Sequence, residues 1–165
     1  MTAPATPARL FEIYGIEIEY MLVDAENFDV RPVAPAVLLD AEGRVSNTVE
    51  DGDITWSNEL AAHVIELKTT APAPDLESLP DRFFASLNRL RLRLPDGVTL
   101  MPSAAHPWMS PEREFTRWVD EDAEIYETFD RIFDCRGHGW SNLQSVHVNL
   151  PFASDAEFAR LHEAI

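Results

Sequence analysis

Apolar residues along the chain either alternate with polar ones or recur three and four positions apart, and the two spacings predict strands and helices respectively. Strands are predicted at residues 11–24, 63–70, 98–104 and 141–152. Helices are predicted at residues 33–43, 76–97, 111–134 (in one piece or two) and from 154 onward. The helix at 76–97 carries one apolar stripe, formed by Leu79, Phe83, Leu87, Leu90 and Leu94. Half-polar strands separated by helices indicate an α+β fold, with an antiparallel sheet and helices packed on one face.

Length and composition fit one folded domain. A chain of 165 residues, 45% of them apolar, can bury a sizeable core. Residues 1–10 are rich in Ala, Pro and Thr, so we expect a flexible tail there and a folded domain over 11–165. In the last helix, Ser154 and Glu157 form a capping box, but the helix reaches Ile165 with no closing glycine or basic turn. This ending predicts that the chain is the N-terminal part of a longer domain.

Two acids lie in the most apolar strand, in the stretch GIEIEY. Side chains alternate along a strand, so Glu17 and Glu19 point to one face, about 7 Å apart at roughly 3.3 Å rise per residue. Met21 and Val23 share that face, which predicts that the acids are partly enclosed. Enclosed carboxylates this close lose hydration and repel, at a cost of several kcal/mol unless a cation or proton intervenes. The alternative is the solvated face of an antiparallel sheet.

A second pair of acids, Glu59 and Glu66, precedes and enters the strand at 63–70. Glu66 lies between Ile65 and Leu67, where packing favours an apolar residue. The odd separation of seven places the two acids on opposite faces of a regular strand, so they can meet only if Glu59 lies in the approach loop or a bulge intervenes. An ion pair between Glu66 and Lys68 is the alternative explanation.

The strand at 141–152 contributes His147 and Asn149 on one face. A single histidine in a strand is more often a hydrogen-bonded core residue, but beside strand carboxylates it becomes a candidate metal ligand. A ligand set rich in carboxylates and free of thiols favours Mg²⁺ or Mn²⁺ over zinc. The sequence has no glycine-rich phosphate loop and no HExxH motif, so a nucleotide would be held through metals and scattered basic residues.

The net charge limits the classes of binding partner, and the cysteine content bears on the cellular location. The formal net charge of −16 repels nucleic acid and anionic membranes, and no stretch has the length and apolar character of a membrane span. Cys135 is the single cysteine, which excludes an internal disulfide and fits a reducing, cytoplasmic location. An anionic partner such as ATP would need divalent cations between it and the acids.

Four stretches in order, GIEIEYMLVD, NELAAHVIELKTTAP, HPW and QSVHVNLPF, resemble the glutamate–cysteine ligase family, especially its bacterial carboxylate–amine ligase branch. The resemblance implies a fold similar to glutamine synthetase, in which a curved antiparallel sheet forms a funnel and acids hold Mg²⁺ against the phosphates of ATP. It also implies the reaction. The γ-phosphate passes to a substrate carboxylate, and an amine attacks the acyl phosphate to give an amide, for example a γ-glutamyl bond between glutamate and cysteine.

The resemblance assigns roles to particular positions. It implies metal ligands at four acids and one histidine, namely Glu17, Glu19, Glu59, Glu66 and His147. Asn149 lies in the same His-x-Asn strand and is a candidate for nucleotide or substrate binding. His106 and Trp108 belong to the His-Pro-aromatic loop, with a structural or substrate-side role. For His106 the alternative is a hydrogen bond that fixes the turn before Pro107.

The chain also departs from the family pattern. Family members are much longer, and their later strands bring a further metal-binding acid and basic residues for ATP and substrate. Residues 11–165 therefore correspond to the N-terminal part of the catalytic domain, and either a complementing C-terminal half or a homo-oligomer could complete it. Small amino-acid-like molecules and ATP are the expected ligands. Two alternatives stay open: a catalytically incomplete remnant that binds divalent cations or a partner chain, and, less favoured, a metal-dependent hydrolase.

Overall fold

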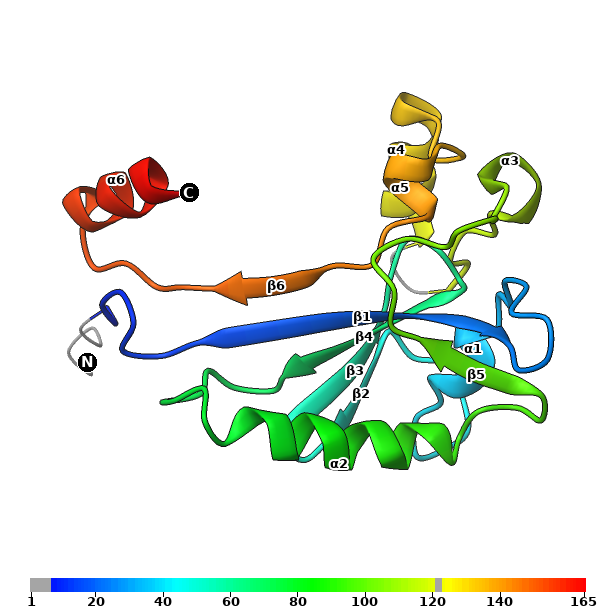
Figure 1. Ribbon diagram of the computed structural model, residues 1–165, viewed down its shortest axis with the longest axis horizontal. Coiled ribbons are helices and arrows are strands. Elements are labelled where there is room, and N and C mark those ends of the chain that lie inside the picture. The colour runs from blue at the N-terminus through cyan, green and yellow to red at the C-terminus, as the bar shows by residue number, and fades with distance from the viewer. Residues whose placement is uncertain (1–6, 121–122) are drawn as a thin grey trace.

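The fold is α+β, as predicted, and its centre is an open antiparallel sheet (Figure 1). The computed structural model describes residues 7–120 and 123–165. Its strands are β1 (Gly15–Asp24), β2 (Thr48–Asp51), β3 (Ile54–Asn58), β4 (Val64–Thr69), β5 (Val98–Met101) and β6 (Val146–Asn149). Its helices are α1 (Ala34–Val37), α2 (Leu79–Arg91), α3 (Pro111–Glu114), α4 (Ala123–Phe133), α5 (His138–Ser141) and α6 (Asp155–Ala164).

Strand β1 is the hub of the sheet. The strand order is β2-β3-β4-β1-β5, and β6 also pairs with β1. One edge of β1 pairs with β4, while the other edge is divided between two strands. On that divided edge, β6 pairs with residues 15–18 and β5 pairs with residues 21–24. A single ten-residue strand therefore positions every other strand that carries a predicted site residue.

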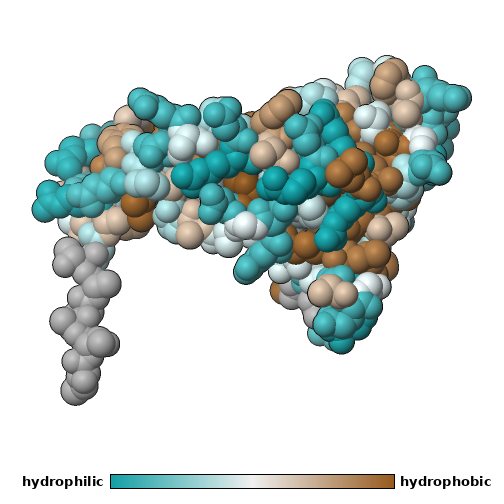
Figure 2. Space-filling view, turned by 90° about the horizontal axis from the view of Figure 1, so that it is seen from below, coloured by the Kyte–Doolittle hydropathy of each residue, from teal (hydrophilic) through white to brown (hydrophobic). Residues whose placement is uncertain are grey.

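Helix α2 covers one face of the sheet. The predicted stripe is correct: Leu79, Phe83 and Leu90 are buried against the sheet. Burying each of these side chains contributes about 1.5–3 kcal/mol. Figure 2, which views the molecule from the α2 side, shows a largely hydrophilic surface, with hydrophobic residues gathered toward the end away from the N-terminus. The helix thus separates an apolar layer from solvent and leaves the opposite face of the sheet to other residues.

A series of side-chain hydrogen bonds fixes α2 to the β2–β3 hairpin. The indole nitrogen of Trp56 donates to the hydroxyl of Ser86 at 2.8 Å, and that hydroxyl donates to Asp51 at 2.6 Å. Arg89 also donates to Asp51, at 2.7 Å. Trp56 and Ser86 are buried, and these hydrogen bonds satisfy donors that would cost free energy if they were buried without a partner.

The short helices α3, α4 and α5 lie at one end of the sheet, on the side away from α2 (Figure 1). The loop between β3 and β4 contacts α5, because the Nε2 of the buried His63 lies 2.8 Å from the carbonyl oxygen of Ser141. At the other end, α6 follows β6, and the Oγ of Ser154 accepts from the amide of Glu157, as the capping box predicts. The carboxylate of Glu157 reaches the amide of Ala153 rather than that of Ser154.

Several boundaries differ from the sequence prediction. The first strand begins at Gly15 rather than residue 11, because Phe11 has a φ of 66° and interrupts the extended backbone. The helix expected at 33–43 is one turn, Ala34–Val37. The prediction for 111–134 resolves into α3 and α4, although residues 121–122 lie outside the described residues. The hairpin of β2 and β3 was not predicted at all.

In the part of the chain that the structure describes, no helix combines the length and the apolar character needed to cross a bilayer.

Candidate functional site

The sheet face opposite α2 gathers the acids of three elements. In the register of β1 with β4, Glu17 lies opposite Lys68 and Glu19 lies opposite Glu66. In the register of β1 with β6, Glu17 also lies opposite His147. Paired residues share a face, so these side chains project together from the sheet. These members of the candidate site are therefore held by strands, which position side chains more rigidly than loops do.

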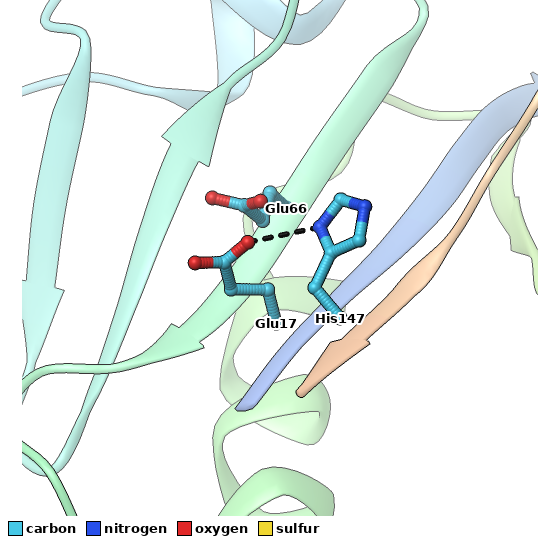
Figure 3. A group of neighbouring side chains, drawn as sticks. All are labelled: Glu17, Glu66 and His147. Carbon is cyan, nitrogen blue, oxygen red and sulfur yellow. Dashed lines mark hydrogen bonds and ion pairs between the residues drawn. The ribbon is translucent and has the colours of Figure 1, made fainter. Parts of the chain in front are cut away.

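One cluster, called group A here, consists of Glu17, Glu66 and His147 (Figure 3). Ligand atoms of the three all lie within 4.8 Å of one another. The Nδ1 atom of His147 lies 2.9 Å from a carboxylate oxygen of Glu17, and this bond joins β6 to β1 across the site. The hydrogen bond with Glu17 raises the pKa of His147. The other oxygen of Glu17 accepts from the Nδ2 of Asn149 at 2.8 Å.

A second cluster, group B, consists of Glu19, Glu59 and Glu66. Its carboxylate oxygens also lie within 4.8 Å of one another. Glu59 lies in the loop that follows β3, the arrangement in which acids seven residues apart can reach one site. Glu66 belongs to both groups and is buried, with 4% of its surface exposed. It therefore links the two clusters into one centre.

The electrostatics of group B reflect enclosure of negative charge. Burial, followed by the nearby carboxylates of Glu66 and Glu19, raises the pKa of Glu59 to about 7. Burial also raises the pKa of Glu19, although the backbone amide of Ser145 donates to its carboxylate at 2.8 Å and opposes the shift. Partly buried carboxylates that repel one another are stabilised when a cation or a proton neutralises their charge.

The donor set fits a hard divalent cation. Each group offers carboxylate oxygens, with one imidazole nitrogen in group A, and such donors suit Mg²⁺ or Mn²⁺. Among the described residues, Lys68 is the basic side chain whose ion pair reaches these acids, at 2.9 Å from Glu66. The hydroxyl of Ser57 donates to the same oxygen at 2.8 Å. Glu66 nevertheless offers a ligand atom to both groups, so the ion pair weighed as an alternative to a functional role coexists with the clusters.

The enclosure inferred from the apolar residues of β1 is present. Met21 and Val23 are fully buried, and they pack with Met109 on the acid face of the sheet. This small apolar cluster closes one end of that face. Glu17 and Glu19 are accordingly only partly exposed, which differs from an ordinary solvated strand face.

Two predicted residues lie apart from the clusters. The Nδ1 atom of His106 accepts from the amide of Met109 at 3.0 Å, and its Nε2 lies 2.8 Å from the carbonyl oxygen of Phe28. Both ring nitrogens thus bond backbone atoms, one in the same loop and one in the segment after β1, an arrangement that favours the turn-fixing role over ligand binding. Trp108 is 56% exposed, and its indole nitrogen lies 3.4 Å from Asp29. Neither residue lines a cavity beside the acids, and a substrate role for them stays a prediction.

Two cavities flank the acid centre. One, of about 370 Å³, lies beside group A and is lined by Glu17, Lys68, Asn149 and residues near the start of β1. The other, of about 280 Å³, lies beside group B. It is lined by Glu19, Glu59, Leu60, Ala61, Val64, Tyr126, Phe129, Gly139, Trp140, Leu143 and Ser145. The sequence prediction missed the aromatic wall of this second cavity.

Comparison with known proteins identifies the family of this chain. The model of glutamate-cysteine ligase family 2 (GCS2) matches residues 13–165, nearly the whole chain. The chain belongs to glutamate-cysteine ligase family 2. An uncharacterized protein of Archaeoglobus fulgidus is 34% identical over 151 residues, which are 92% of this chain and 40% of that protein.

A solved structure shares the fold of this GCS2 family member. The crystal structure of a bifunctional glutathione synthetase from Pasteurella multocida superposes with a TM-score of 0.55 at 21% sequence identity. The match covers 93% of this chain and 19% of that one. The chain thus spans less than half the length of both relatives. Its family is described as a glutamate-cysteine ligase family, and the solved structure supports the fold alone.

Proposed function

We propose that this chain is the N-terminal part of an ATP-dependent carboxylate–amine ligase, which forms an amide through an acyl phosphate. The observation that carries the proposal is the pair of clusters, joined by Glu66, whose ligand atoms could hold cations, in a chain of the GCS2 family. Ligases of this kind must hold a triphosphate beside a carboxylate, and two linked clusters of acids suit that task when cations are bound.

The residues that would hold Mg²⁺ are those of groups A and B. When bound, Mg²⁺ would orient the triphosphate and neutralise the charge that develops during phosphoryl transfer. The remaining work falls to the protein. Asn149 and His147 fix the carboxylate of Glu17, and the amide of Ser145 fixes that of Glu19. Preorganised ligands of this kind avoid reorganisation when the substrates arrive.

The cavity beside group A is the candidate nucleotide site. Lys68 and Asn149 line it and supply hydrogen-bond donors at the edge of the acid cluster. A phosphate chain that enters this cavity would meet the ammonium of Lys68 on one side and the cation held by Glu17 on the other. This placement supports Lys68 and Asn149 as phosphate-binding residues.

The catalytic domain extends beyond this chain in our proposal. The chain spans 40% of its Archaeoglobus relative. Val146 and Val148 of β6 lie on the face opposite His147, and they are 66% and 55% exposed. Apolar strand residues exposed in this way favour further packing, as a remaining segment or a complementing chain would provide.

The test is ADP release. The purified full-length protein that contains this chain is incubated with ATP and Mg²⁺ and is offered a panel of carboxylates and amines, singly and in pairs. Ligase activity predicts ADP release only when both are present, and its loss in the double variant Glu17→Gln, Glu19→Gln. A second candidate function, a cation-binding domain without turnover, is favoured by the scarcity of basic residues at the acid face. Retained Mn²⁺ binding without amine-dependent ADP release would select it.

A further inference from the structure

Lys68 is the only lysine of the sequence, in which every other strongly basic side chain is an arginine. It projects from β4 at the acid face of the sheet, opposite Glu17 of β1 and opposite Thr55 of β3. A lysine ammonium is a compact charge on a flexible stem, whereas an arginine guanidinium holds a carboxylate in a planar, two-point arrangement. The residue type at this position therefore suits a cation that changes partners.

The first partner of Lys68 is Glu66. The Nζ of Lys68 lies 2.9 Å from the Oε1 of Glu66, and the Oγ of Ser57 donates to the same oxygen at 2.8 Å. Glu66 is 4% exposed and belongs to both group A and group B. The ammonium thus neutralises the one acid that the two groups share. A divalent cation at either group must bind beside this ammonium or displace it, and like charges repel.

The second partner is an anion in the cavity beside group A. The side chain of Lys68 is 35% exposed, and it lines this cavity of about 370 Å³ together with Glu17 and Asn149. Among the described residues that line the cavity, Lys68 is the single Lys or Arg. A phosphate group that enters the cavity is therefore attracted to the same ammonium that neutralises Glu66.

Ser57 allows Glu66 to keep a hydrogen bond when the ammonium leaves. Ser57 is buried, lies opposite Glu66 in the register of β3 with β4, and donates through a neutral hydroxyl. This bond is independent of Lys68, and it holds the carboxylate in place in both situations. A buried carboxylate still requires a neutralising charge, and a divalent cation supplies it once Lys68 has moved.

We propose that Lys68 exchanges between Glu66 and an anion in the cavity beside group A, and that this exchange couples cation binding to phosphate binding. The proposal rests on the ligase function proposed above. Without an anion, the ammonium competes with divalent cations for Glu66. A phosphate group draws the ammonium away and leaves Glu66 to the cation, so each ligand strengthens the binding of the other by the same factor.

The test is calorimetry of Mn²⁺ binding to the full-length protein that contains this chain, with and without sulfate at constant ionic strength. Sulfate is the probe because it is a tetrahedral oxyanion, as a phosphate group is. It should tighten Mn²⁺ binding to the unaltered protein about tenfold, a size typical of coupled sites. Without sulfate, Lys68→Met should bind Mn²⁺ about tenfold more tightly than the unaltered protein, and sulfate should then add less than about twofold.

Two further variants support this comparison. Lys68→Gln keeps a hydrogen-bond donor for Glu66 but carries no charge, so it should show the same gain in Mn²⁺ affinity even if Lys68→Met folds poorly. Arg82→Met is the matched control, because it removes one positive charge from α2, on the other side of the sheet, where Arg82 lies 3.5 Å from Asp53. It should retain both the Mn²⁺ affinity and the sulfate effect of the unaltered protein.

A static ion pair between Lys68 and Glu66 predicts a different result. Mn²⁺ affinity would then stay equal or fall in both Lys68 variants, and that outcome overturns the exchange. The absence of a sulfate effect in the unaltered protein overturns it as well, and so does the absence of Mn²⁺ binding in every form of the protein. The ligase proposal fails separately, through ADP release that does not depend on an amine, so the two failures are distinguishable.

Discussion

The carboxylates of Glu59 and Glu66 come within 4.8 Å of each other, although seven residues separate them. Glu66 projects from β4, while Glu59 reaches the same point from the loop after β3. Because Glu59 lies in a loop, its side chain does not follow the face alternation of a strand. The antiparallel pairing of β3 with β4 brings this loop back beside the acid face. The consequence is a partly buried acid beside a buried one, and this neighbourhood raises the pKa of Glu59.

Stability without divalent cations should fall as pH rises. The folded chain keeps the proton of Glu59 up to about pH 7, whereas an unfolded glutamate releases it near 4.5. Between these values the folded state binds more protons, so the free energy of unfolding decreases as pH rises from 5 to 8. The raised pKa of His147 acts in the same direction. Urea unfolding in the presence of a chelator measures the slope.

The matched variants for this experiment are Glu59→Gln and Glu77→Gln, since Glu77 is exposed and remote from the acids. Glu59→Gln should flatten the pH dependence, and Glu77→Gln should leave it intact. An equal slope in the Glu59 variant would contradict the assignment.

Cation affinity should show the opposite trend with pH. A cation at group B requires the ionised form of Glu59, so affinity for Mn²⁺ should rise through pH 7. Binding at pH 6 should release protons to the buffer, and calorimetry in two buffers of different ionisation enthalpy measures their number. A proton count of zero at pH 6 would show that Glu59 does not take part.

The sharing of Glu66 predicts a hierarchy among variants. Glu66→Gln should weaken Mn²⁺ at both groups, whereas His147→Ala should affect group A and Glu59→Gln should affect group B. Loss of one ligand or its orientation typically costs about 10–100-fold in affinity. Calorimetric stoichiometry with each variant separates the cases. Identical effects of all three would mean a single site.

The turn-fixing role of His106 makes a different prediction. His106→Ala removes hydrogen bonds to the backbone of Met109 and Phe28, and it should lower the free energy of unfolding by about 1–3 kcal/mol. Mn²⁺ affinity and ADP release per folded molecule should not change. A stable variant with impaired ADP release would instead support the substrate-side role. Thermal unfolding and the ADP assay together decide between them.

The sequence was informative where chemistry and spacing are local. Alternation alone placed Glu17 and Glu19 on one face, and the apolar Met21 indicated enclosure, because both arguments need only the geometry of one strand. The β2–β3 hairpin was also within reach. Asp51 and Ile54 flank a Gly-Asp turn in which Gly52 has a φ of 72°, a recognised two-residue hairpin signal.

Other features depend on pairing across long stretches of chain. Nothing within β6 specifies that His147 pairs with Glu17, because that register is set by contacts between residues 130 positions apart. The same holds for the aromatic wall. Phe129 lies in α4 and Trp140 in α5, and they line one cavity only because the two helices come together beside the sheet. Local propensity does not encode such placement.

The division of one edge of β1 between β5 and β6 makes this strand unusually sensitive to insertion or deletion. A single residue added after Glu19, at the centre of β1, would turn Glu17 and Glu19 toward α2 and place Ile16 and Ile18 on the acid face. β1 has no loop that could accommodate the added residue, because its residues are paired in fixed register with three strands, β4, β5 and β6. The number of residues in β1 is therefore as constrained as their identity.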